Sequence, residues 1–144
     1  MSAEPLFVSV VVPCRNELRY IAACLNSILG SDYPADRLEI LVVDGRSDDG
    51  TRAIIEDYAA RGPGVRLIDN PKGITPVALN LGIRAARGDV IVRMDVHVLY
   101  PPEYIPRLVA ALQTSGADNV GAVLVTRPAN DNAIPRAIAV ALSH

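Results

Sequence analysis

The sequence lacks several features that would place the protein in a membrane, outside the cell or on a nucleic acid. No apolar run reaches the ~18 residues of a membrane-spanning helix, and the N-terminus has no charged segment followed by a long apolar stretch, as a secretory signal would. The formal net charge is −2, whereas nucleic-acid binding usually requires a basic face. The two cysteines, Cys14 and Cys24, are isolated, and we expect both to be reduced and buried in a cytoplasmic protein.

Two common nucleotide-binding motifs are also missing. Neither Gly-x-Gly-x-x-Gly nor Gly-x-x-x-x-Gly-Lys-Ser/Thr follows the first predicted strand, residues 7–12, so neither a dinucleotide fold nor a P-loop is indicated.

The composition is 50% hydrophobic and 21% charged, which is typical of a globular chain. A chain of 144 residues is long enough to bury a substantial core. We therefore expect residues 1–144 to form a single domain.

Short β-branched segments alternate with segments of helical periodicity along the chain. Strands are predicted at residues 7–12, 38–43, 65–68, 90–94 and 120–126. Helices are predicted between a cap at Asn16 and Gly30, between a cap at Ser47 and Gly62, from a cap at Thr75 to Ala85, at 102–112 and at 134–143. Such alternation produces right-handed crossovers and a parallel sheet covered on both faces. The predicted fold class is α/β, a three-layer αβα sandwich with a mainly parallel sheet.

Polar residues follow three of the predicted strands, at the carboxyl ends where ligands of such sheets bind. The first two groups are Pro13-Cys14-Arg15-Asn16-Glu17 and the segment from Asp44 to Thr51. Asp44 could accept a hydrogen bond from a base or a ribose hydroxyl, or it could be a helix-capping Asp in an ordinary turn. Arg15 and Lys72 could neutralise phosphate, or they could be solvated surface cations. Cys14 is predicted to pack in the core and not to act as a nucleophile.

The third polar group is Asp95-Val96-His97. Two ligands separated by one residue at a strand end would point the same way, which suits a divalent cation that carries a diphosphate. A site with one histidine and one carboxylate suits Mn²⁺ better than a site with two carboxylates would, and Mg²⁺ is the alternative cation. The alternative interpretation is an Asp turn that leads into Tyr100-Pro101-Pro102. We predict Asp95 and His97 as metal ligands.

These segments resemble the donor-binding half of an inverting glycosyltransferase of family two, which has the GT-A fold. The resemblance covers roughly residues 6–127 and is carried by residues 10–17, 41–51 and 70–95. Within the family, 93–97 and 100–102 are most similar to enzymes that build bacterial exopolysaccharides such as succinoglycan. The resemblance implies that Pro13 to Glu17 and Asp44 contact the nucleoside, that Asp95 lies by the ribose, and that His97 binds the metal where the family usually has Asp.

The family also implies a second half, which carries the acceptor site and a catalytic general base. No residue after Arg127 is predicted to supply that base, so the catalytic residue stays unassigned and the isolated chain is expected to be inactive. Without the second half, apolar surface at 120–125 and 134–142 is expected to be uncovered and to cause self-association. The expected partners are a nucleotide diphosphate sugar, above all a UDP-sugar, and a glycan or lipid-linked acceptor. A full-length form is expected at the inner face of a membrane. A nucleotidyltransferase and a non-catalytic nucleotide-binding fragment are the alternatives.

Overall fold

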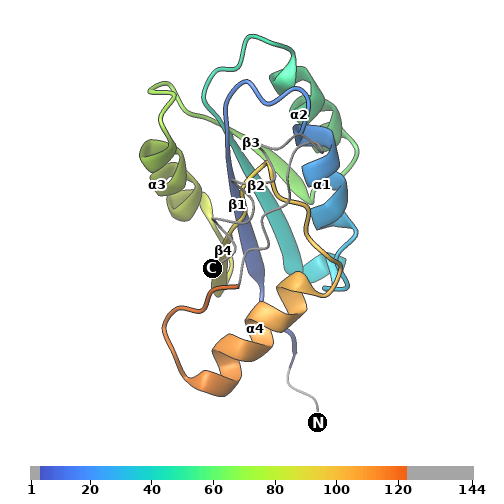
Figure 1. The fold of residues 1–144 in the computed structure, drawn as a ribbon, viewed down its shortest axis with the longest axis vertical. Helices are drawn as coiled ribbons and strands as arrows, with labels where there is room; N and C mark the ends of the chain where they lie inside the picture. The colour runs from blue at the N-terminus through green and yellow to red at the C-terminus, as the bar shows by residue number, and fades with distance from the viewer. Residues whose placement is uncertain (1–3, 123–144) are drawn as a thin grey trace, which may run out of the picture. The chain divides into compact units, whose positions relative to one another are not determined.

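The computed structural model describes residues 4–122 and contains an open parallel sheet (Figure 1). The chain divides into two compact units, Met1–Ala110 and Ala111–His144, and the sheet lies in the first. The strands are β1 (Val8–Cys14), β2 (Leu38–Asp44), β3 (Val65–Asp69) and β4 (Val90–Arg93). Their order is β3-β2-β1-β4, and every pair is parallel. The prediction that one domain spans 1–144 stays a prediction.

The register brings the carboxyl ends of β1, β2 and β3 to one level, and β4 ends on the same side of the sheet. Cys14 at the end of β1 lies beside Asp44 at the end of β2, which in turn lies beside Asp69 at the end of β3. On the other side of β1, Arg93 at the end of β4 lies beside Val11. Loops that leave these strands therefore meet at a single edge of the sheet.

The helices follow the predicted periodicity, with shifted ends. They are α1 (Ile21–Leu29), α2 (Thr51–Ala60), α3 (Thr75–Ala85) and α4 (Tyr104–Ser115), with a short 3₁₀ helix η1 (Ala35–Arg37) before β2. Asn16, Ser47 and Thr75 are not the caps that the sequence suggested. The cap positions are Tyr20, Gly50 and Ile74, because the two loops before α1 and α2 use Asn16 and Ser47 to bond to each other.

Two apolar layers cover the sheet, which gives the predicted three-layer arrangement. Alternate residues of the central strands, such as Val10 and Val12, join α1, α2 and the start of α4 in the larger cluster. Val11 and its neighbours on the other face pack against α3. At that contact a Cβ on Gly82 would lie 2.4 Å from the Val11 Cγ1 atom, so only glycine lets the helix approach this closely.

The predicted fifth strand and last helix fall largely outside the described residues. Residues 120–122 have no regular structure, and 123–126 and 134–143 lie beyond the part that the structure describes. The expected self-association surface shares this position and stays a prediction. Within residues 4–122, no helix combines the length and hydropathy needed to span a bilayer.

A buried carboxylate holds the amino end of the sheet together. Glu39 on β2 is 1% exposed and accepts hydrogen bonds from the Ser9 hydroxyl of β1 at 2.7 Å and from the Arg87 backbone N–H at 2.8 Å. The guanidinium groups of Arg87 and Arg66 also bind it, each at 3.0 Å. Burial raises the pKa of the Glu39 carboxyl, but these hydrogen bonds outweigh it and lower the pKa to about 2.

Candidate nucleotide-sugar site

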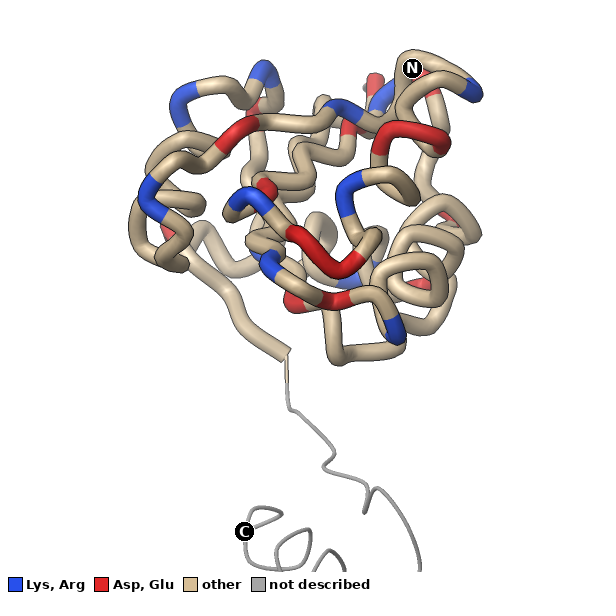
Figure 2. Tube along the Cα trace, turned by 90° about the horizontal axis from the view of Figure 1, so that it is seen from above, with Lys and Arg blue, Asp and Glu red and all other residues tan. Residues whose placement is uncertain are grey.

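The predicted site residues lie at the carboxyl ends of the strands and in the loops that follow them. Figure 2 views the sheet from this end and shows acidic and basic residues interleaved along the loops. Pro13 lies in the last part of β1 and Arg15 to Glu17 follow that strand. Asp44 ends β2, Lys72 lies between β3 and α3, and Asp95 and His97 follow β4. Asp44 and Asp95 are therefore at the same end of the sheet, as the alternation of strands and helices predicted.

The loops after β1 and β2 are joined by hydrogen bonds that the sequence did not reveal. The Asn16 backbone N–H donates to the Ser47 hydroxyl at 2.8 Å, and the Asp48 N–H donates to Asn16 Oδ1 at 3.0 Å. The Glu17 N–H donates to Thr51 Oγ1 at 2.8 Å. Asn16 adopts a φ of 54°, a left-handed conformation that Asn tolerates better than most residues. The two loops therefore form one preorganised unit.

Asp44 organises this unit from inside. Its side chain is fully buried and accepts hydrogen bonds from Ser47 Oγ at 2.6 Å and from the Arg52 guanidinium at 3.1 Å. Arg52 also bonds to Asp69 at 3.1 Å, and Arg46 pairs with the same Asp69 carboxylate. A nucleoside would have to share the Asp44 oxygens with Ser47 and Arg52. The turn-stabilising role is thus visible in the structure, and contact with a nucleoside stays a prediction.

A pocket of ≈ 140 Å³ opens between the end of β1 and the start of α3. Its lining combines the end of β1 and the β1–α1 loop with the β3–α3 turn and the start of α3: Pro13, Cys14, Arg15, Glu17, Asn70, Gly73, Ile74, Thr75 and Ala78. Of the residues predicted for the site, Pro13, Arg15 and Glu17 line this pocket.

Arg15 and Gly73 shape one wall of the pocket. Arg15 Nη1 donates to the Gly73 carbonyl at 3.4 Å, and a Cβ on Gly73 would lie 2.5 Å from that nitrogen. Gly73 has a φ of 64°, so the turn itself also requires glycine. Asn70 is buried and holds the turn by donating from Nδ2 to the Ile74 carbonyl, while Oδ1 accepts from the exposed Lys72 N–H. The Asn-Pro-Lys-Gly pattern could have predicted this turn.

The segment after β4 differs from the expected strand end. β4 ends at Arg93, and the Val98 N–H donates to the Asp95 carbonyl, so Asp95 to Val98 form a turn. Strand alternation therefore does not orient the two predicted ligands, and each has its own partner. Asp95 pairs with Arg93 at 3.1 Å. His97 Nε2 lies 2.9 Å from Glu17 Oε1.

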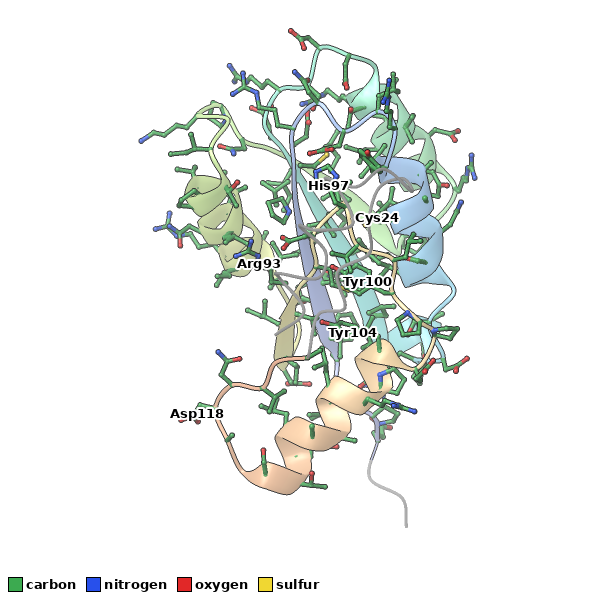
Figure 3. The ribbon with its side chains drawn as sticks, in the orientation of Figure 1. Cys24, Arg93, His97, Tyr100, Tyr104 and Asp118 are labelled. Carbon is green, nitrogen blue, oxygen red and sulfur yellow. The ribbon has the colours of Figure 1, made fainter. Side chains whose placement is uncertain are left out.

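Tyr100 anchors this turn. Its hydroxyl accepts a hydrogen bond from the Asp95 N–H at 2.7 Å and donates to the Asp95 carbonyl at 3.2 Å. Burial raises the pKa of the Tyr100 hydroxyl well above its usual value, so it stays protonated. Figure 3 shows His97 at the carboxyl end of the sheet and Arg93 on the side of α3. Sequence reasoning treated Tyr100 only as the end of an Asp turn and missed this role.

The residues of the turn fit a divalent cation that is shared with a bound diphosphate. Within residues 4–122 no three His, Cys, Asp or Glu side chains are grouped as a complete metal site. Asp95 offers a half-exposed carboxylate and His97 an exposed imidazole. A cation that keeps one or two protein ligands and takes the rest from phosphates and water needs no more than this.

Cys14 is not part of this chemistry. It is buried at the end of β1, and burial together with the nearby Asp44 and Glu17 carboxylates raises the pKa of its thiol to about 12. A thiol of that pKa is protonated at neutral pH, whereas a nucleophile must be a thiolate. The structure supports the predicted packing role.

The family model described as "Glycosyl transferase family 2" matches residues 9–143. The chain belongs to glycosyl transferase family 2. It is 36% identical over 119 residues to the succinoglycan biosynthesis protein ExoA of Rhizobium meliloti (strain 1021), covering 81% of this chain and 36% of that protein. An undecaprenyl-phosphate 4-deoxy-4-formamido-L-arabinose transferase of Pseudomonas savastanoi pv. phaseolicola is 36% identical over 124 residues, covering 84% of this chain and 36% of that protein. The chain thus spans little more than a third of the length of each of these two relatives.

The solved structure of another glycosyltransferase has a similar fold. The mannosyltransferase of Pyrobaculum calidifontis, in complex with GDP-Man and Mn²⁺, superposes with a TM-score of 0.68 at 32% identity. The match covers 81% of this chain and 34% of that one. The predicted glycosyltransferase family and its GT-A fold, of which these residues form a part, are confirmed.

Proposed function

We propose that this family 2 chain binds the nucleotide diphosphate sugar for an inverting glycosyl transfer, with a UDP-sugar as the favoured donor. The observation that carries the proposal is that the segments following β1, β2 and β4 contact one another at the carboxyl edge of the sheet, where a pocket opens between β1 and α3. These segments are the ordered β1–α1 loop, the loop after the buried Asp44 that ends β2, and the turn that contains Asp95 and His97. Open α/β sheets bind ligands at such edges.

The pocket and the charged groups suit different parts of the donor. A volume of ≈ 140 Å³ is below that of a pocket for a whole drug-sized ligand, so it suits a part of the nucleotide such as the base. Arg15 and Lys72 would neutralise the diphosphate. Asp95 and His97 would hold Mn²⁺ or Mg²⁺, which when bound would stabilise negative charge on the diphosphate leaving group. The protein residues around them position the donor and keep the turn in place.

The acceptor in this proposal is a glycan or a lipid-linked sugar carrier. Relatives are named for succinoglycan biosynthesis and for transfer involving undecaprenyl phosphate, which motivates both classes. A lipid-linked acceptor would bring the reaction to a membrane surface. The general base that deprotonates the acceptor hydroxyl is not assigned to any residue of this chain.

Calorimetry with purified chain tests the proposal. UDP, UDP-glucose, GDP-mannose and UTP are titrated separately, with and without Mn²⁺. We expect the UDP ligands to bind and Mn²⁺ to tighten them. Arg15→Ala should weaken the binding, while Arg107→Ala, which changes an exposed arginine on α4, serves as the matched control. Tight binding of UTP with no binding of either nucleotide sugar would instead support a nucleotidyltransferase, and no binding at all would refute the proposal.

A further inference from the structure

We propose that Glu17 is the positioning residue for His97, holding its imidazole so that Nδ1 is the nitrogen that faces a divalent cation. This inference rests on the proposed function, because it concerns the metal of that same site. It joins two segments that are 80 positions apart in the sequence, the β1–α1 loop and the turn after β4.

The geometry selects one tautomer of His97. Nε2 lies 2.9 Å from Glu17 Oε1, and an ionised carboxylate can only accept hydrogen bonds. Nε2 must therefore carry the proton in the neutral ring, which leaves the lone pair on Nδ1. Metal-bound histidines in proteins characteristically donate the other ring N–H to a carboxylate or a carbonyl in this way. The Glu17–His97 pair has the geometry of the carboxylate–histidine part of such a metal site.

Glu17 is well placed to hold the ring because its own position is constrained. Its N–H donates to Thr51 Oγ1 at 2.8 Å, and its carbonyl accepts from the N–H groups of Tyr20 and Ile21 at the start of α1. Its side chain is 20% exposed, whereas that of His97 is 59% exposed. The Tyr20 ring meets the imidazole edge-on, with centroids 4.7 Å apart. The β1–α1 loop thus restrains an otherwise exposed imidazole from two sides.

The pairing also explains why a histidine suits position 97 in this chain. A carboxylate at position 97 would add a second negative charge near Glu17, and nearby like charges destabilise each other. An imidazole can donate to Glu17 and still keep a second nitrogen for the metal. His97 and Glu17 therefore form a matched pair, which predicts that they cannot be replaced independently.

The tautomer is tested directly by nitrogen NMR on the chain without metal. The chain has two histidines, so His97→Ala identifies the His97 signals. We expect the wild type to show the Nε2–H tautomer at His97, and Glu17→Ala to shift the ring toward a mixture of tautomers. A wild-type His97 protonated on Nδ1, or a tautomer that Glu17→Ala leaves unchanged, would overturn the inference without touching the proposed function.

Metal binding is tested by electron paramagnetic resonance of free Mn²⁺ in the presence of saturating UDP. We expect Glu17→Ala to weaken Mn²⁺ about 10- to 100-fold, Glu17→Gln to weaken it less because the amide oxygen still accepts a hydrogen bond, and the Glu17→Ala/His97→Ala double variant to match His97→Ala alone. Glu103→Ala, which removes a half-exposed carboxylate on the segment before α4, is the control. Thermal unfolding of each variant shows that it is folded.

The outcomes separate the two proposals. If His97→Ala loses Mn²⁺ while Glu17→Ala and Glu17→Gln bind it as the wild type does, Glu17 has no positioning role and the donor-binding proposal stands. If wild-type chain binds UDP with no contribution from Mn²⁺, the inference and the metal part of the proposed function both fail. Additive losses in the double variant would show that the two residues act separately, and would also overturn the inference.

Discussion

Replacing Glu39 by Gln should destabilise the fold by roughly 3 kcal/mol at neutral pH. The carboxyl pKa falls from its ordinary value of 4.5 to about 2 in the folded chain, and each tenfold change in proton affinity is worth about 1.4 kcal/mol. The side chain is 1% exposed, so solvent screens it little. Gln has the same size but no charge. Its NH₂ group would face donors in either orientation: the Ser9 hydroxyl and the Arg87 N–H at one oxygen position, or the Arg66 and Arg87 guanidinium groups at the other.

The sign of the pH dependence follows from the lowered pKa. A carboxyl whose folded pKa lies below its unfolded one stabilises the fold fully above the unfolded value and loses that stabilisation as pH falls toward the folded value. Wild-type stability should therefore decline between pH 4.5 and about pH 2 in part because of Glu39. The Glu39→Gln variant should lack this component, so the two proteins should approach the same stability in acid.

Urea unfolding followed by far-ultraviolet circular dichroism measures both effects, since the chain has no tryptophan to report by fluorescence. Unfolding curves at pH 7 and pH 3 give the free energy of unfolding of each variant. Glu56→Gln, at an exposed position on α2, is the matched control and should change stability little. A loss below about 1 kcal/mol at pH 7, or a Glu39→Gln variant with the wild-type decline in acid, would show that the buried network does not act as described.

Further substitutions test the packing and the site. Gly82→Ala should destabilise by about 1–3 kcal/mol, because its methyl would lie 2.4 Å from a β1 valine, while Gly62→Ala has nothing within 4 Å and should be neutral in the same urea titration. Asp44→Ala should weaken UDP roughly 10- to 150-fold in calorimetry with or without Mn²⁺, and unchanged affinity would exclude it from the site. Tyr100→Phe removes both hydrogen bonds to the Asp95 backbone. It should weaken Mn²⁺ measurably while leaving metal-free UDP binding intact, and equal Mn²⁺ affinity would refute its anchoring role.

The elements of the fold could be predicted from sequence because their signals are local. Alternating β-branched runs and helical periodicity depend on neighbours a few residues apart, which is why β1, β2, β3 and β4 lie close to the predicted ranges. Glycine and proline residues between these segments predicted the helix ends to within a few residues. Parallel strands joined by right-handed crossovers then place all carboxyl ends at one edge, so the edge where the candidate site residues gather also followed from sequence.

The caps and turns were predicted less well, because tertiary contacts compete for the same groups. Ser47 reads as a helix cap in sequence, but its hydroxyl bonds to Asp44 and to the Asn16 N–H instead. Asp95 and His97 read as neighbours on one strand face, yet β4 ends at Arg93 and Tyr100 holds a turn there. A local pattern states which bonds a residue can make, and the packing of distant loops decides which it does make.

The sequence by itself determined the family, the sheet and the edge where polar residues gather. Only the tertiary structure decided which side chains pair with each other at that edge and at the opposite, amino end of the sheet. Glu39 is a buried charge whose partners come from β1, from β3 and from the turn before β4. His97 pairs with Glu17, which lies 80 positions earlier in the sequence. Hydrogen bonds of this kind depend on ångström-scale register between segments that are distant in sequence, and no local periodicity carries that information.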